Sequence, residues 1–257
     1  AASDVYKRQE EGAGQVDRDG CREGRRTVCS SQEGRGDACR ERREEGRFVT
    51  SGPGIWITLE GGDGSGKTTQ SNLLAQWMTD EGRTVVRTRE PGGSEVGQLI
   101  RDIVLHHRGD IAPRAEALLY AADRAHHVAT VVRPALARGE VVLQDRYLDS
   151  SVAYQGAGRV LDGDEIRGLS LWAAEGALPD LTVLLDLDPE SARVRLDSAD
   201  KPFDRLEAEK NEFHARVRDA YLALAQAEPD RFLVLDAAAT PEVIAEQIRE
   251  RVATLIG

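Results

Sequence analysis

Several residue types are scarce in this sequence, and each shortage narrows what the protein can be. The 257 residues include three cysteines and one methionine, and aromatic side chains make up 5%. All three cysteines (Cys21, Cys29 and Cys39) lie in the first 50 residues, at spacings that fit no standard zinc pattern. No apolar run reaches the ~18 residues of a membrane-spanning helix, and no signal-peptide pattern is present. We therefore expect a cytoplasmic protein with no disulfide framework and no membrane partner.

Positive charge is scarce too. The chain has 34 Lys and Arg against 45 Asp and Glu, a net charge of −11, and residues 1–50 hold 11 of each sign, so the deficit lies entirely in the remainder. A broad nucleic-acid or membrane surface needs an excess of cations, which this acidic body lacks. We expect no nucleic-acid partner, and we expect any internal cationic cluster to bind a small anion.

The first 50 residues contain almost no large apolar side chains, so they cannot bury enough surface to offset the entropy of folding. We expect this segment to be disordered and a single domain to span residues 51–257. The chain does not begin with methionine, and residues 4–9 resemble a translated sequencing-library adapter. Since the only methionine is Met78, we expect a natural start at another codon, with Val49 as the candidate.

The most informative stretch is residues 55–70, IWITLEGGDGSGKTTQ, where an apolar run meets a helical pattern through a glycine-rich turn. Its spacing matches the GxxxxGK[ST] phosphate-binding loop. Glycines let main-chain amides turn toward an anion, the lysine adds charge at the β- and γ-phosphates, and the threonine hydroxyl suits Mg²⁺. A plain glycine turn is the alternative, but the flanking strand and helix favour the loop. We expect ATP to contact Gly61, Gly62, Asp63, Gly64, Ser65, Gly66, Lys67, Thr68 and Thr69.

Downstream, short apolar runs alternate with helical patterns. The runs begin at Ile55 and cover residues 84–88, 141–143, 181–187 and 232–235. This alternation predicts an α/β fold with a five-stranded parallel sheet flanked by helices. Ligands of such sheets bind at the carboxyl ends of the strands. The phosphate loop, residues 89–93 and residues 145–155 should therefore share one edge.

Five segments carry a family resemblance: EGGDGSGKTTQ, TREPGGS, LLYAADRAHH, DRYLDSSVAYQG and FDRLE. Together they resemble thymidylate kinase, of the P-loop nucleoside monophosphate kinase superfamily, from about residue 55 to the end. DRYLDSSVAYQG is the most specific of them. The resemblance implies a P-loop kinase fold with a short mobile lid, and magnesium-dependent transfer of phosphate from ATP to dTMP in dTTP biosynthesis. It also implies a homodimer.

The resemblance assigns roles to individual residues. Arg124 and Arg146 are expected to hold the acceptor monophosphate, a task for which the planar guanidinium fork is suited. Tyr120, one helical turn before Arg124, is expected to stack on thymine. Tyr154 is expected to crowd the 2′ position of the sugar. The base pocket is expected to include Ser151, Gln155, Glu90 and Pro91.

Catalysis should depend on positioning and charge, with no general base. The expected catalytic residues are Lys67, Arg146, Arg205 and Asp63, and the expected Mg²⁺ ligands are Thr68 and Asp145. The lid should lie at residues 197–205. Because Gly64 stands where some relatives carry an arginine, the lid must supply the transition-state cation. We expect Arg205 to do so, with Lys201 and Arg195 as lesser candidates.

Other interpretations stay open from sequence alone. Arg124 could pair with Asp123 or Glu116 on a solvated helix, and Tyr120 could be plain core. His126 and His127 are interpreted as helix surface, and His106 and His107 receive no role. The chain could also be a kinase for CMP, UMP or a deoxynucleoside, or a module that binds ATP without catalysis. Discrimination against dUMP and the dimer interface are not predicted.

Overall fold

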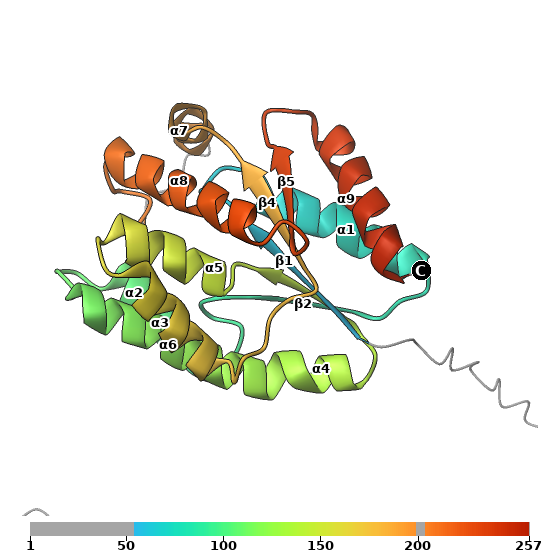
Figure 1. Cartoon of the computed structure of the whole chain (residues 1–257), viewed down its shortest axis with the longest axis horizontal. Helices are drawn as coiled ribbons and strands as arrows, with labels where there is room; N and C mark the ends of the chain where they lie inside the picture. Colours follow the sequence, from blue (N-terminus) through green and yellow to red (C-terminus); the bar gives the residue numbers. More distant parts are fainter. Residues whose placement is uncertain (1–53, 199–203, 257) are drawn as a thin grey trace, which may run out of the picture. The chain divides into compact units, whose positions relative to one another are not determined.

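The computed structural model describes residues 54–198 and 204–256, so the predictions for residues 1–50, Val49 and Lys201 lie outside the described part. Five strands form one parallel sheet in the order β2-β3-β1-β4-β5 (Figure 1). The predicted α/β fold is confirmed. The strands are β1 (Ile55–Glu60), β2 (Val85–Arg89), β3 (Val141–Asp145), β4 (Leu181–Asp186) and β5 (Phe232–Asp236).

Central strands are buried on both faces, which is why their sequences are almost wholly apolar. All six residues of β1 are buried, whereas β2, at the edge, alternates between half-buried and exposed. The register aligns Leu59 of β1 with Asp145 of β3, and Asp145 with Arg89 of β2. Three strands therefore end at the same level, and the loops that follow them meet at one edge.

Helices cover both faces of the sheet (Figure 1). One face packs against α1 and α9 through Leu74, Met78, Ile244 and Ile248. Trp56 faces the other side, where it packs with Val128 and Tyr147. The helices are α1 (Lys67–Asp80), α2 (Glu95–His106), α3 (Pro113–His127), α4 (Arg133–Ala137), α5 (Leu148–Ser151), α6 (Gly163–Ala173), α7 (Pro189–Asp197), α8 (Asn211–Ala227) and α9 (Pro241–Ile256).

The long helical pattern over residues 114–138 is interrupted as predicted. A wide π-helical turn, Val128–Val132, separates α3 from α4, and Pro134 lies in the first turn of α4. Proline lacks the amide that would continue the regular ladder, so the chain changes its hydrogen-bonding step just before it. A second π-helical segment, Val152–Gly158, follows α5, so the DRYLDSSVAYQG stretch is mostly helical.

The apolar residues of α2 are only partly buried. Ile100 and Val104 are buried, but Val96, Leu99 and Ile103 are 44%, 67% and 45% exposed. The apolar side chains of α2 thus lie on two faces of the helix, and the described residues cover one of them. Among the described residues, no helix is long and apolar enough to cross a membrane.

Candidate active site

A large cavity of about 610 Å³ lies where β1, β2 and β3 end. This volume falls within the ~300–1,000 Å³ typical of ligand sites. Residues from the phosphate loop, the loop after β2, α3 and the segment after β3 all line it. It includes every residue predicted to contact the acceptor: Glu90, Pro91, Tyr120, Arg124, Arg146, Ser151, Tyr154 and Gln155.

The phosphate loop joins β1 to α1, and its geometry requires glycine. Gly61 has φ of 133°, and a Cβ added there would lie 2.4 Å from the carbonyl oxygen of Leu185. Lys67 folds back over the loop, and its Nζ donates hydrogen bonds to the carbonyls of Gly61 (3.2 Å) and Gly62 (2.8 Å). Burial, followed by the nearby Arg146 charge, lowers the pKa of Lys67. The loop residues that face the large cavity are Asp63, Gly64, Gly66, Lys67 and Thr68.

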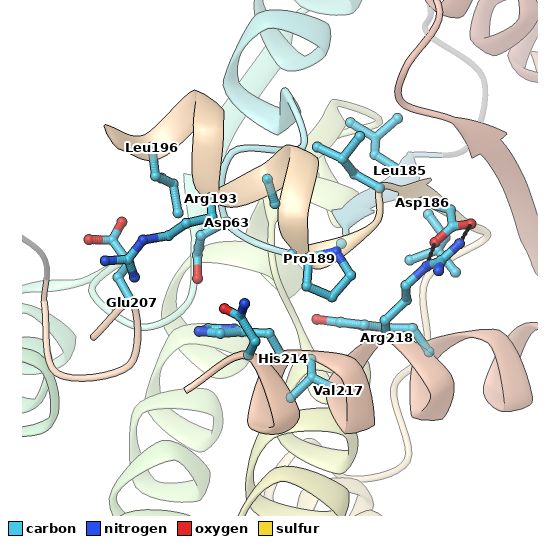
Figure 2. Close-up of a pocket in the computed structure, with 17 residues that line it drawn as sticks. Asp63, Leu185, Asp186, Pro189, Arg193, Leu196, Glu207, His214, Val217 and Arg218 are labelled. Carbon is cyan, nitrogen blue, oxygen red and sulfur yellow. Dashed lines mark hydrogen bonds and ion pairs between the residues drawn. The ribbon is translucent and has the colours of Figure 1, made fainter. Parts of the chain in front are cut away.

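Gly61 and Gly62 instead border a second, smaller cavity between the loop, α7 and α8 (Figure 2). His214 and Val217 of α8 face α7 across it, and Arg218 pairs with Asp186 at its rim. This cavity measures about 40 Å³. That is room for roughly three water molecules and far too little for a nucleotide. The large cavity is therefore the candidate active site.

The predicted metal ligands suit Mg²⁺. Asp145 and Thr68 both line the large cavity. Oδ1 of Asp145 is buried and accepts no hydrogen bond from the described residues, so one carboxylate oxygen is left for a cation. Mg²⁺ commonly binds through one or two protein oxygens together with substrate phosphates and water. In the described ranges, no group of three or more His, Cys, Asp or Glu side chains is arranged so that it could hold a metal ion.

Arg146 lies between the two ends of the cavity. Its φ of 67° is in the left-handed region, which side chains other than glycine rarely adopt and which is concentrated at functional sites. One guanidinium nitrogen lies 2.5 Å from Asp63 and 3.2 Å from the hydroxyl of Tyr154. Burial would raise the pKa of Asp63, but Arg146 and then Lys67 outweigh it and lower the pKa to about 2. The predicted acidic residue of the loop thus faces a cation.

Arg124 is almost fully buried, at 1% exposure. It donates to Glu90 (2.9 Å), Ser170 (2.9 Å) and Ser151 (3.1 Å), and its guanidinium lies 5.3 Å from the Tyr147 ring centre. The alternative of a solvated helix surface is therefore wrong. Arg124 thus contacts Glu90 and Ser151, two of the residues predicted for the base pocket.

His127 was predicted to lie on the helix surface, and this prediction is wrong. The side chain is fully buried. Its Nδ1 lies 2.9 Å from Glu90 and its Nε2 lies 2.6 Å from the Thr88 hydroxyl. Glu90 thus bridges His127 and Arg124 through its two carboxylate oxygens. The peptide bond between Glu90 and Pro91 is cis.

The structure distinguishes between Arg205 and Arg195, two of the residues predicted to supply the transition-state cation. Arg205 does not line the cavity; it forms an ion pair with Glu116 and donates to the carbonyl of Val104 (2.9 Å). Its position argues against the predicted catalytic role, because its charge is held by a fully buried carboxylate. Arg195 of α7 does line the cavity and donates to the phosphate-loop carbonyl of Gly64 (3.4 Å).

Several residues in the site were not predicted. Arg101 of α2 lines the cavity and donates to the carbonyl of Pro91 (2.9 Å). Its spacing from the TREPGG loop, about two helical turns further on, was the available signal. Other lining residues outside the prediction are Arg89, Leu105, Tyr147, Ser150, Leu196, Asp204, Leu206 and Glu207.

A strand, a phosphate loop and a helix, facing a second cationic pocket across one cavity, define a phosphotransferase of the P-loop nucleotide kinase class. The comparisons agree. The sequence profile of the thymidylate kinase family matches residues 59–248. The chain belongs to the thymidylate kinase family, whose members phosphorylate dTMP to dTDP.

The match between this chain and its relatives covers most of the length of each relative. A thymidylate kinase of Leifsonia xyli subsp. xyli is 74% identical over 202 residues, covering 79% of this chain and 96% of the relative. One of Bifidobacterium longum subsp. infantis is 52% identical and covers 79% and 88%. The crystal structure of thymidylate kinase from Ehrlichia chaffeensis aligns with a TM-score of 0.64 at 30% identity, over 78% of this chain and 99% of that one.

Proposed function

We propose that the protein transfers the γ-phosphoryl group of ATP to dTMP in the large cavity, with Mg²⁺ bound at the donor phosphates. One observation carries this proposal: phosphate-loop residues, among them Lys67, and the residues predicted for the acceptor, among them Tyr120, line the same cavity. Phosphoryl transfer needs donor and acceptor in line, so a shared cavity is its basic requirement.

At the donor end, main-chain amides of the loop and the Nζ of Lys67 would hold the ATP phosphates. Thr68 and Asp145 would hold Mg²⁺. When bound, the ion would neutralise charge on the transferring phosphate. Arg195, which already contacts Gly64, is the lid residue best placed to add a further positive charge at the same phosphate.

At the acceptor end, we assign the two arginines different tasks. Arg146 lies beside Asp63 of the loop and would grip the dTMP phosphate where the two phosphates meet. Arg124 bonds to Ser151 and Glu90, so we assign it to the thymine end. Tyr120 would stack on the base. Tyr154, whose hydroxyl lies 3.3 Å from Asp63, would border the sugar.

We also propose that the protein acts as a homodimer through α2 and α3, which pack side by side. Leu99 of α2 and Leu118 of α3 are 67% and 58% exposed. Large apolar side chains gathered on neighbouring helices are typical of subunit contacts. Leu99→Glu should shift the mass in solution toward the monomer, and Leu178→Glu, also at an exposed leucine, should not. The cytoplasmic location and the lack of a nucleic-acid partner stay predictions.

A coupled assay of ADP release over a panel of nucleoside monophosphates tests the activity. The expected result is turnover with dTMP, less with dUMP, and little with CMP, UMP or ribothymidine monophosphate. Tyr154→Phe would remove one hydroxyl beside the sugar and serves as the matched variant for the ribose arm. Preference for a pyrimidine ribonucleotide over dTMP would contradict the proposal.

A further inference from the structure

A fully buried carboxylate lies behind the acceptor site, at the last residue of β1. Glu60 is 0% exposed and precedes the phosphate loop. It accepts three hydrogen bonds: from the main-chain amide of Tyr147 (2.7 Å), the hydroxyl of Ser150 (2.7 Å) and the hydroxyl of Tyr221 (2.8 Å). Burial of a charge without such donors would be costly, so the three groups are needed to keep it there.

The two hydroxyls also contact Arg146. One of its terminal nitrogens lies 3.2 Å from Ser150 and 3.3 Å from Tyr221. A hydroxyl has one proton to donate and two lone pairs to accept with. When both protons point to Glu60, the lone pairs of both oxygens are free to accept from Arg146. The carboxylate thus sets the direction of both hydrogen bonds.

Arg146 is fixed on its other sides as well. Its main-chain amide donates to Leu59 (3.0 Å), and its carbonyl accepts from the side chain of Gln144 (3.0 Å). The second terminal nitrogen contacts Asp63. The guanidinium is thus held at both terminal nitrogens, and the hydroxyl pair is what holds the first one, which bonds nowhere else among the described residues.

We propose that Glu60 is a positioning residue of the acceptor site. Acting through Ser150 and Tyr221, it turns the guanidinium of Arg146 toward the acceptor phosphate. Because Tyr221 lies on α8, this arrangement also connects that helix to the acceptor site. The inference rests on the proposed role of Arg146 in holding that phosphate.

Two variants separate positioning from packing. Glu60→Gln keeps the shape but introduces an N–H donor. If that donor faces the hydroxyl pair, one hydroxyl must accept from it, and its own proton then turns away from residue 60, toward the other hydroxyl 2.8 Å away or toward Arg146. Tyr221→Phe keeps the ring, which packs edge-on to Tyr154, and removes one hydroxyl. We expect kcat/KM for dTMP to fall about tenfold in Tyr221→Phe, and at least as far in Glu60→Gln, as for loss of a hydrogen bond to a charged group.

The test compares the effect of each variant on dTMP kinetics with its effect on ADP binding. The dissociation constant for ADP, measured by calorimetry, should stay within twofold in both variants. In the Tyr221→Phe/Ser150→Ala background, Glu60→Gln should have no further effect on dTMP kinetics, since the relay is already gone. Thr58→Val is the matched control: it removes a buried hydroxyl that bonds Thr182 (2.9 Å) two residues from Glu60. Its dTMP kinetics should match those of the wild type.

Equal losses for dTMP and ADP, or no loss for dTMP, in Tyr221→Phe would overturn the inference. So would full additivity of Glu60→Gln with the double variant. Failure of the underlying function has a different signature. If Arg146→Lys leaves dTMP kinetics unchanged, Arg146 does not hold the phosphate at all, and the assignment of the acceptor end is what fails.

Discussion

The two ends of the cavity are built in different ways. The donor end comes from one continuous loop, of which Asp63, Gly64, Gly66, Lys67 and Thr68 line the cavity. The acceptor end is assembled from separate segments between Glu90 and Gln155, and both of its arginines are paired with carboxylates: Arg124 with Glu90, and Arg146 with Asp63 of the loop.

This difference predicts a division of labour. Main-chain amides bind an anion without adding side-chain charge to the fold, and the buried cation of the donor end, Lys67, hydrogen-bonds to neutral carbonyls, so removing a donor-end side chain should change the stability little. A buried ion pair costs several kcal/mol if one partner is lost, because the other stays buried and uncompensated. The acceptor end should therefore carry both substrate specificity and a share of the folding free energy.

The largest effect is expected from Arg146→Ala. It removes the cation between the two phosphates, and a transition-state arginine is worth about 10³- to 10⁵-fold in rate. Single-turnover and steady-state kinetics should show a loss in this range with dTMP, while ADP binding changes by less than threefold. A matching loss of ADP binding would break the distinction between the two ends.

Glu90→Ala tests stability at the acceptor end. It leaves the buried Arg124 without its ion-pair partner, so the free energy of unfolding should fall by about 3 to 5 kcal/mol. Urea denaturation followed by circular dichroism measures it. Lys67→Ala is the donor-end control: Lys67 donates to neutral carbonyls, and its removal should cost under about 1 kcal/mol. Equal losses would contradict the division.

Arg195 and Arg205 can be compared directly by replacing each with alanine. Arg195→Ala should lower kcat by about 10²- to 10³-fold, as for removal of one group that stabilises developing charge. Arg205→Ala should change kcat by less than threefold, although it leaves Glu116 with fewer partners. A larger kinetic effect at Arg205 than at Arg195 would restore the role that the sequence predicted for Arg205.

The smallest effect concerns pH and Glu60. Burial and then the nearby Asp149 carboxylate raise the pKa of Glu60 to about 7 in the folded protein, against 4.5 ordinarily. A raised carboxyl pKa contributes stability that is full below pH 4.5 and is lost as pH rises through 7. Other charged or titratable groups near Glu60 are Arg146, Lys67, Tyr154 and Tyr221.

Urea denaturation between pH 5 and 8 measures this. The stability of the wild type relative to Glu60→Gln should decline by up to about 1 kcal/mol per pH unit within that window. The kinetics can be followed over the same pH range. At each pH, kcat/KM for dTMP in the wild type is divided by kcat/KM in Glu60→Gln, so that the titration of the dTMP phosphate, which affects both proteins equally, cancels. A flat stability difference would show that Glu60 titrates normally.

Much of the fold could be predicted because its signals are local. Apolar runs located all five strands, and the spacing from Gly61 to Thr68 located the loop. The acceptor residues were found only as a set, through segments that match a family. The predictions that failed were those that depended on the direction in which a side chain points. His127 was misplaced because adjacent histidines on a helix give no sign of which one faces inward.

The same limit applies to the lid and to α2. Spacing alone cannot say whether Arg195 or Arg205 points at the phosphates, since the answer depends on where Glu116 draws the second arginine. Glu60 was missed because its partners, Ser150 and Tyr221, are 90 and 161 residues away. Helical period places Leu99 and Ile100 on different faces of α2 but does not tell which face is covered.

The central claim is that Arg146 and Arg124, both at the acceptor end, bind different parts of dTMP: Arg146 the phosphate and Arg124 the thymine. A crystal structure with ADP, Mg²⁺ and dTMP bound tests it most directly. The predicted result is the dTMP phosphate within hydrogen-bonding distance of Arg146, and the thymine ring on Tyr120 beside Arg124 and Ser151. A dTMP phosphate bound by Arg124, with Arg146 turned away from Lys67, would contradict the account.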